Sequence, residues 1–343
     1  MTAKKSRLGC SIDLNARGKQ LGHLTLMWSD DRYGGGPILI PIAVIAGGPG
    51  KTALITGGTH GDEYEGQMIA RRIIAETDPA ALTGRIIVLP AHNFLAVSEA
   101  ARCAGVDNVN LNRAFPGDAD STPTMMLAHY VESQILPLCD VAMDIHSGGK
   151  RGEYLPVGYL RQAGDAAFMA RKIAATNAFG APMTVVVGKT ADDRSLSAAC
   201  DRVGVPMIAS ELGGQGAISL GPYRIGYAGV RGVLAHFGIL APPREGVPEP
   251  RTRFMSIPDR SFSAMATVDG LFMPSVVLGD QVGPGDLAGT IHALGDLTQP
   301  PVEVRFQKAG TVVARRAATL VRRGEFMFHC AVEVSPESLL QGA

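Results

Sequence analysis

The sequence predicts an α/β protein with a mostly parallel, mixed sheet flanked by helices, followed by a small all-β domain. Short apolar runs alternate with helix-like segments between residues 53 and 237, as in sheets that are covered on both faces. Residues 241–254 are rich in proline and polar side chains, which indicates a linker. Beyond the linker, short β-like runs are separated by glycine turns. We therefore expect a large α/β domain at 1–240 and a small β-sandwich or barrel-like domain at 255–343.

The composition limits the class of protein. The 343 residues include 32 Lys and Arg and 32 Asp and Glu, so the chain lacks the basic character of a nucleic-acid-binding protein. No apolar run approaches the roughly 18 residues of a membrane span, and no signal peptide is evident. The five scattered cysteines favour reduced thiols over disulfides or a thiolate zinc site. These features predict a cytoplasmic protein that binds neither nucleic acid nor membrane.

An N-terminal strand region, residues 8–50, precedes the alternating part of the chain. It ends in the glycine-rich turn Gly47–Gly50, which is not a phosphate loop because a strand, and not a helix, follows it. Strand-like segments then lie at 53–57, 85–90, 140–145, 183–187 and 205–209. Helix-like segments lie at 66–76, 122–136, 164–179, 193–203 and 225–237.

Polar side chains follow four of these strands at the point where each strand ends. They are His60 and Glu63 after the first strand, His92 after the second, His146 after the third and Glu211 after the last. Because open α/β sheets bind ligands at the carboxyl ends of their strands, we expect a site at this edge. The His60–Glu63 spacing is weak evidence alone, since it arises by chance in a chain with 8 histidines. No pattern pairs His92 with a partner, so we interpret it as a loop histidine with its own hydrogen bonds.

Two histidines and one glutamate form a suitable ligand set for a catalytic zinc ion. We interpret His60, Glu63 and His146 as the ligands, because three protein ligands leave a fourth position open for water. Glu211 would be the general base that takes a proton from that water. Asp144, two residues before His146, is expected to face away from the site and to be a weaker supporting candidate. The alternatives are that His60 only satisfies backbone groups of its turn and that Glu211 is an ordinary solvated carboxylate.

The loop from Asp107 to Gly117 is a second candidate for binding. It is rich in Asn and Asp, contains a single arginine, Arg113, and closes with Pro-Gly. An arginine that is fixed between two turns can present two parallel N–H donors to a carboxylate. The alternative is a structural loop in which Arg113 pairs with a local aspartate.

Four segments in this chain share their order and residues with a known family. They are Gly57–Gly66, Asn110–Gly117, Asp144–Gly149 and Glu211–Gly214. The sequence thereby resembles the succinylglutamate desuccinylase/aspartoacylase family, whose members are zinc-dependent amide hydrolases related to the zinc carboxypeptidases. The resemblance implies a zinc carboxypeptidase-like sheet and one Zn²⁺ per chain, bound by the three ligands proposed above.

The resemblance also implies roles for individual residues. Glu211 would be the general base, while Asn112 and Arg113 would bind the carboxylate of the substrate. Aspartoacylases proper carry an Asn-Pro-Arg segment after the second strand, and the resemblance assigns its arginine to the oxyanion. Here residues 93–95 read Asn-Phe-Leu, so we expect Arg102 to replace it, because the bacterial branch has an arginine at that place. The alternative for Arg102 is an arginine of a surface helix or loop.

The expected function is a zinc-dependent deacylase that acts on a small N-acyl amino acid. Within the family, the sequence is most similar to the bacterial branch that removes acetyl from N2-acetyl-L-2,4-diaminobutyrate during ectoine degradation. The alternatives are an aspartoacylase, a succinylglutamate desuccinylase or a carboxypeptidase, and the missing Asn-Pro-Arg arginine weighs against the first. A more remote alternative is a non-catalytic protein that binds metal or carboxylate. The family resemblance also favours a homo-oligomer.

Overall fold

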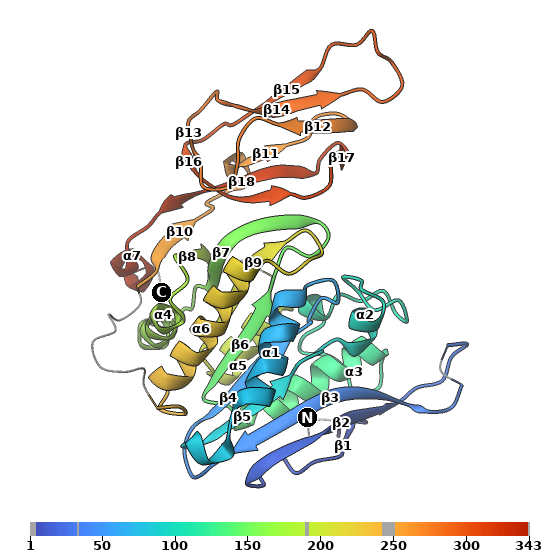
Figure 1. Cartoon of the computed structure of the whole chain (residues 1–343), viewed down its shortest axis with the longest axis vertical. Helices are drawn as coiled ribbons and strands as arrows, with labels where there is room; N and C mark the ends of the chain where they lie inside the picture. Colours follow the sequence, from blue (N-terminus) through green and yellow to red (C-terminus); the bar gives the residue numbers. More distant parts are fainter. Residues whose placement is uncertain (1–4, 33, 189–191, 242–250, 342–343) are drawn as a thin grey trace.

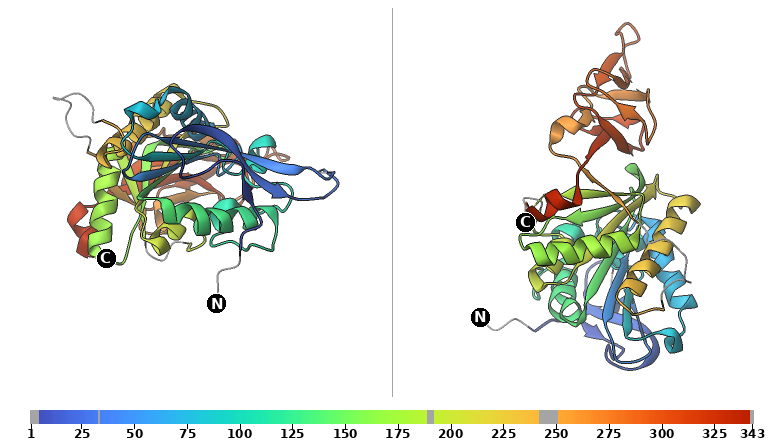
Figure 2. Two further views of the ribbon diagram at one scale, coloured as in Figure 1. Left: turned by 90° about the horizontal axis from the view of Figure 1, so that it is seen from below. Right: turned by 90° about the vertical axis from the view of Figure 1, so that its left-hand side faces the viewer.

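The computed structural model describes residues 5–32, 34–188, 192–241 and 251–341. It confirms a mixed α/β architecture in which helices pack against a large sheet. A β-rich part, drawn in orange and red, lies at one end of the molecule, and several of its strands extend that sheet (Figure 1). A view turned by 90° shows the same arrangement of the two parts (Figure 2, right).

One mixed sheet joins fourteen strands of the described chain. Along its main path the order is β1-β2-β3-β5-β4-β6-β9-β7-β8-β10-β18-β16-β13, and β11 pairs with β18 beside this path. The strands up to the predicted linker are β1 (Gly9–Cys10), β2 (Gly18–Met27), β3 (Pro37–Ala46), β4 (Thr52–Gly57), β5 (Arg85–Leu89), β6 (Val141–His146), β7 (Gly152–Arg161), β8 (Met183–Val187) and β9 (Met207–Gly214).

The later strands complete this sheet and build a smaller one. They are β10 (Arg253–Ser256), β11 (Ser263–Met265), β12 (Gly270–Pro274), β13 (Gln281–Val282), β14 (Leu287–His292), β15 (Val302–Arg305), β16 (Gly310–Arg316), β17 (Leu320–Val321) and β18 (Phe326–Glu333). The smaller sheet has four strands in the order β15-β14-β12-β17, all of them paired antiparallel.

The parallel strands β5, β4, β6 and β9 form the centre of the large sheet. Their residues are mostly apolar and almost all buried, as expected for strands that carry helices on both faces. Because the strands run in the same direction, their carboxyl ends lie at one edge, where His146 on β6 is directly opposite Glu211 on β9. The register therefore brings two of the predicted site residues together.

Helices cover both faces of the sheet. α1 (Tyr64–Glu76), α4 (Ala166–Phe179) and α6 (Leu220–His236) contribute their buried apolar side chains to the core on one face. On the other face lie α2 (Phe94–Ser98), α3 (Pro123–Tyr130) and α5 (Leu196–Val203). A short last helix, α7 (Pro336–Gln341), packs beside α4. Within the described residues, no helix has the length and apolar character needed to cross a membrane.

The structure differs from the sequence-based expectation at β7, a ten-residue strand that was not predicted. Pro156 lies inside this strand, and proline normally argues against a strand interior because it cannot donate a ladder hydrogen bond. The structure accommodates it at an irregularity in the pairing with β9, between Tyr154 and Val157. β9 also extends five residues beyond the predicted end at 209, so Glu211 lies within the strand and not past it.

The predicted linker, 241–254, ends too late. β10 begins at Arg253 and pairs in parallel with β8, so the large sheet continues beyond the linker into the β-rich part. Residues 242–250 of the linker lie outside the described residues. Two further contacts cross the junction: β16 pairs with β7, and Arg315 forms an ion pair with Glu153 at 2.5 Å.

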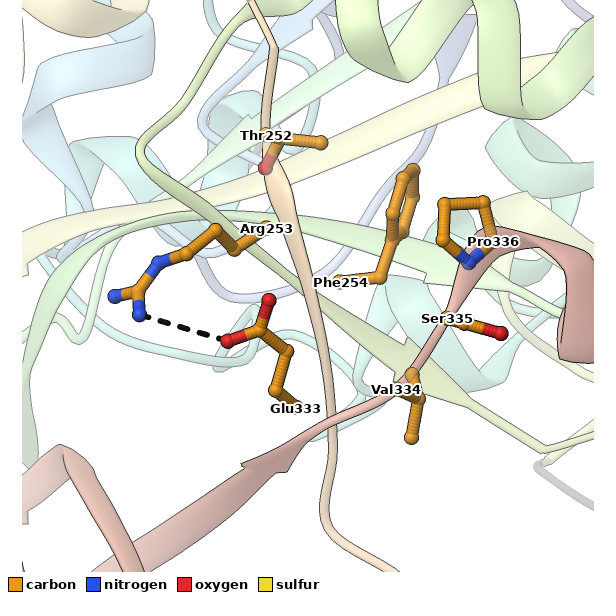
Figure 3. A pocket seen from close by; sticks show the side chains of 7 residues that line it. All are labelled: Thr252, Arg253, Phe254, Glu333, Val334, Ser335 and Pro336. Carbon is orange, nitrogen blue, oxygen red and sulfur yellow. Dashed lines mark ion pairs between the residues drawn. The ribbon is translucent and has the colours of Figure 1, made fainter.

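A cavity of about 350 Å³ lies at this junction (Figure 3). It is lined by residues of β10, the end of β18 and the start of α7, and the Arg253–Glu333 ion pair of 3.7 Å lies on its wall. None of the predicted site residues lines it. The cavity is therefore lined only by residues that follow the predicted site residues in the chain, and it is separate from them.

Candidate active site

The three predicted metal ligands lie together at the carboxyl edge of the sheet. His60 and Glu63 occupy the turn between β4 and α1, and His146 is the last residue of β6. One ligand atom of each lies within 4.8 Å of the others, and the three residues are 2–5% exposed. The turn needs Gly61 because a Cβ there would lie 1.9 Å from the carbonyl oxygen of Ala96.

Each histidine directs Nδ1 towards the carboxylate of Glu63. His60 Nδ1 lies 2.7 Å from Oε1, and His146 Nδ1 lies 2.7 Å from Oε2. On the other side of each ring, Nε2 faces an oxygen that accepts a hydrogen bond: Asn110 Oδ1 at 3.1 Å for His60, and Asp144 Oδ2 at 2.7 Å for His146. Both rings are therefore oriented by a partner outside the ligand cluster, as is usual for histidines that bind metal.

The expectation that Asp144 faces away from the site was wrong. Side chains alternate along a strand, so residues two positions apart share a face, and Asp144 lies on the same face of β6 as His146. Asp144 is completely buried and also accepts hydrogen bonds from Thr56 and Thr59, each at 2.7 Å. Burial alone would raise the pKa of Asp144, but the adjacent His146 outweighs burial and lowers it.

The donor set fits a zinc ion on its own chemistry. A neutral imidazole has one donor nitrogen and one acceptor nitrogen, so a ring that donates from Nε2 has a lone pair at Nδ1. Against the effect of burial, Asp144 and Glu63 raise the pKa of His146 well above its ordinary value, so without a metal the ring also donates from Nδ1 to Glu63. A metal that replaced the Nδ1 protons would meet the lone pairs of both rings and the two carboxylate oxygens of Glu63. Burial would raise the pKa of Glu63, but the two histidines lower it to about 2, so the carboxylate is ionised. Two imidazole nitrogens with one carboxylate are ligands typical of Zn²⁺.

Glu211 lies beside this cluster, directly opposite His146 in the register of the sheet. Its Oε2 is buried and has no partner among the described residues. Burial, assisted by the negative charge of Glu63, raises the pKa of Glu211 well above its ordinary value. An unpaired carboxyl group with a raised pKa, next to a cation site, has the properties that a general base needs.

Arg102 reaches the same cluster from the loop after α2. Its guanidinium NH1 lies 3.5 Å from Glu63 Oε1 and 3.4 Å from His60 Nδ1, and its side chain is 38% exposed. The loop is held in place because Lys150 Nζ donates to the carbonyl of Ala100 at 2.7 Å and the amide of Gly61 donates to that of Ala101. The structure thus places Arg102 beside two predicted ligands, and its part in the reaction remains a prediction.

Arg113 and Asn112 are both engaged by other parts of the chain. Arg113 Nε lies 3.0 Å from Asp192 Oδ2, and Arg194 donates to the same carboxylate at 2.8 and 2.9 Å. Asn112 accepts a hydrogen bond from the amide of Leu196 at 3.0 Å through Oδ1. The arginine therefore already binds one carboxylate, which comes from a distant loop and not from its own. Substrate binding by these two residues stays a prediction.

A comparison with protein families decides the class of this site. Residues 49–237, more than half of the chain, match the succinylglutamate desuccinylase/aspartoacylase catalytic domain. The chain belongs to this family. The family expected from the four sequence segments is thereby confirmed, and all four segments fall within the matched range.

Relatives within the succinylglutamate desuccinylase/aspartoacylase family extend along nearly the whole chain. An N-alpha-acetyl-L-2,4-diaminobutyric acid deacetylase of Halomonas elongata is 32% identical over 322 residues, which is 94% of each chain. The product-bound structure of the ectoine utilization protein EutE (DoeB) from Ruegeria pomeroyi has a TM-score of 0.91 and 36% identity, covering 96% of this chain and 100% of that one. A succinylglutamate desuccinylase/aspartoacylase from Rhodobacter sphaeroides matches with a TM-score of 0.89 and 34% identity at the same coverage.

Several residues around the site of this family member were missed from the sequence. Asn110 was quoted within its loop, but nothing pointed to its contact with His60. Thr59 and His92 meet through a 3.1 Å contact between Oγ1 and Nδ1, although His92 was interpreted as an unrelated loop residue. Tyr154, on the unpredicted strand β7, interacts electrostatically with Glu211, Glu63 and Arg102. Only correct counting of side-chain faces along β6 would have found Asp144.

Proposed function

We propose that this protein is a zinc-dependent deacylase that removes the acyl group, an acetyl, from N2-acetyl-L-2,4-diaminobutyrate. The observation that supports it most is the pair of imidazole Nδ1 atoms that face the Glu63 carboxylate, with the unpaired carboxyl group of Glu211 next to them. The deacetylase of Halomonas elongata supports the choice of substrate, because it is similar along 94% of this chain.

His60, Glu63 and His146 would hold one Zn²⁺. When bound there, the ion would polarise the acyl carbonyl and lower the pKa of water. Glu211 would take a proton from the attacking water and deliver it to the leaving amine, since its position beside the cluster leaves its carboxyl group free. Asp144 and Asn110 would keep the two imidazole rings oriented through their Nε2 atoms.

The two arginines would bind the charges of the substrate. Arg102 would donate hydrogen bonds to the acyl oxygen as negative charge develops on it, because its guanidinium lies against the predicted ligands. Arg113 and Asn112 would bind the α-carboxylate. The contact between Arg113 and Asp192 supports this role, since the guanidinium donates to a carboxylate in its present position. We also propose 1–240 as the catalytic domain and 255–343 as a small β-sandwich or barrel-like domain whose strands extend the large sheet.

A second candidate function is the deacylation of an N-acyl dicarboxylic amino acid, as in an aspartoacylase or a succinylglutamate desuccinylase. The observation that favours it is that Arg113 and Arg194 share the carboxylate of Asp192, so two cationic side chains lie close together. A second carboxylate on the substrate could pair with the second arginine.

The test is an elemental analysis of the purified protein together with hydrolysis assays on a panel of substrates. The panel contains N2-acetyl-L-2,4-diaminobutyrate, N-acetyl-L-aspartate, N2-succinyl-L-glutamate and a peptide with a free carboxyl end. We expect about one zinc per chain and the highest kcat/KM for the diaminobutyrate derivative. Preference for either dicarboxylate would support the second candidate. Bound zinc without hydrolysis of any substrate would contradict both.

A further inference from the structure

A chain of hydrogen bonds leads from His146 into the interior of the protein. His146 Nε2 lies 2.7 Å from Asp144 Oδ2, the other oxygen of Asp144 lies 2.7 Å from Thr59 Oγ1, and Thr59 Oγ1 lies 3.1 Å from His92 Nδ1. All four residues are buried, with exposures between 0% and 5%. The chain lies beneath the candidate metal site, and nothing in the proposed reaction uses Thr59 or His92.

The direction of each hydrogen bond follows from the groups themselves. A carboxylate only accepts, so both His146 Nε2 and Thr59 Oγ1 must donate to Asp144. Thr59 has a single hydroxyl hydrogen, which this bond uses, so its oxygen must accept from His92 Nδ1–H. Burial lowers the pKa of His92 to about 4, which leaves the ring neutral near pH 7 with a lone pair at Nε2. That Nε2 is buried without a partner among the described residues.

These directions have one consequence at the metal site. Because Asp144 accepts the Nε2–H of His146, Nδ1 is the ring nitrogen that faces Glu63 and is left to bind a metal. Two hydroxyl groups, those of Thr56 and Thr59, donate to the same oxygen of Asp144 and stop its carboxylate from rotating. Only the hydroxyl of Thr59 is itself held by a further side chain, His92.

We propose that Thr59 and His92 are positioning residues, which act through Asp144 to fix the ring orientation and tautomer of His146 for metal binding. The proposal rests on the proposed function, because it takes His146 as a metal ligand. The unpaired Nε2 of His92 costs stability, because a buried polar atom without a partner is unfavourable. The imidazole therefore needs a compensating role, and its hydrogen bond from Nδ1 to Thr59 provides one. A leucine would fill the same space without that donor.

The test measures zinc affinity, because affinity reports on the ligands without depending on turnover. The metal-free protein is titrated with zinc against a chromophoric chelator, for the wild type and for two matched pairs of variants. Thr59→Val removes the hydroxyl while Thr59→Ser keeps it. His92→Leu removes the donor while His92→Asn keeps an N–H close to the place of Nδ1.

We expect Thr59→Val to weaken zinc binding by about 10–100-fold and His92→Leu by about 10-fold, as for other groups that orient a metal ligand. Thr59→Ser and His92→Asn should stay within about threefold of the wild type. Thermal unfolding of each metal-free variant shows whether the fold is retained. The conservative variants carry the test where the apolar ones do not fold, since each must keep wild-type affinity.

Two outcomes would overturn the proposal. Wild-type zinc affinity in folded Thr59→Val and His92→Leu would show that the hydrogen bonds from His92 to Asp144 do not position His146. Equal loss in all four variants would show that these sites matter only for packing. Failure of the wild type itself to bind zinc would instead contradict the proposed function, so the two failures are distinguishable.

Discussion

The candidate active site has a buried side and an exposed rim, and the two differ in how their charges are balanced. On the buried side, His60, Glu63 and His146 are at most 5% exposed, and each polar atom faces a specific partner. On the rim, the side chains of Arg102 and Arg113 are 38% and 44% exposed and make ion pairs that solvent screens. The ligand side chains on the buried side are therefore held in fixed positions, whereas the charges of the rim arginines are weakened by solvent.

This difference predicts two kinds of mutational effect. A charge in a dry site interacts strongly with its neighbours, so removing one partner leaves another uncompensated. A charge at a wet rim is weakened by water and salt, so its loss costs less. Variants of the metal ligands on the buried side should change metal binding. Variants of the rim should leave metal binding nearly unchanged and act through the substrate, Arg102 in the transition state and Arg113 in binding.

The largest expected effect is that of Glu211→Gln. The substitution keeps the shape of the side chain but removes the base, so kcat should fall by about 10²–10⁴-fold while bound zinc remains. Steady-state kinetics and elemental analysis on the same preparation test both parts. Glu65→Gln is the matched control, because Glu65 is also a buried carboxyl group with a raised pKa but accepts a hydrogen bond from Ser219. Near wild-type turnover by Glu211→Gln would exclude it as the base.

Arg102→Met should have the next largest effect. If it also weakened zinc binding as a change in a buried ligand would, the difference between the buried side and the rim would not hold. Loss of a donor to the developing oxyanion lowers kcat by about 10²–10³-fold. Zinc affinity should change little, because Arg102 is not a ligand and lies partly in solvent. The kinetics are compared with those of Arg32→Met, which removes an arginine that contacts Glu99 and Gly105 in the same loop. An unchanged kcat in Arg102→Met would show that Arg102 is a surface arginine without a part in the reaction.

Arg113→Lys tests the rim through substrate affinity. Lysine keeps the charge but cannot form two parallel hydrogen bonds, so KM should rise about tenfold with little change in kcat. The change should shrink as salt concentration rises, since the group is 44% exposed. A fall in kcat at constant KM would show that Arg113 acts in the chemical step and not in binding.

The sequence predicted the ligand cluster because that cluster depends on topology. Parallel strands place their carboxyl ends at one edge, so His146 and Glu211 become neighbours whatever their separation in the chain. The turn with His60 and Glu63 follows from glycines after a strand, and Gly66 allows α1 to approach β6, since a Cβ there would lie 1.9 Å from the carbonyl oxygen of Ile145. These features are local or fixed by strand direction.

The supporting contacts could not be predicted in the same way. Asn110 is 50 residues from His60, and His92 is 33 residues from Thr59, so each contact depends on how separate loops pack. β7 escaped prediction because Pro156 interrupts its pattern, and the structure solves this with an irregular register that a sequence does not reveal. Asp144 differs from these, because the alternation of side chains along β6 is sufficient to place it on the face of His146.

The smallest expected effect is a pH dependence of the free energy of unfolding that comes from the buried His92. Its pKa is lowered by burial from 6.5 to about 4, so between these values the unfolded chain binds a proton that the folded chain does not. The stability that this group provides is therefore present above pH 6.5 and lost as the pH falls towards 4. Between pH 7 and pH 5.5 the loss is about 1 kcal/mol.

Urea unfolding of the metal-free protein at these two pH values measures this loss. His92→Asn cannot titrate, so its free energy of unfolding should fall by about 1 kcal/mol less than that of the wild type over the same interval. His23→Asn is the control for the loss of a histidine at the surface, because His23 is exposed. If His92→Asn and the wild type lose the same stability, His92 is protonated in the folded protein, and the hydrogen-bond directions beneath His146 must then be reassigned.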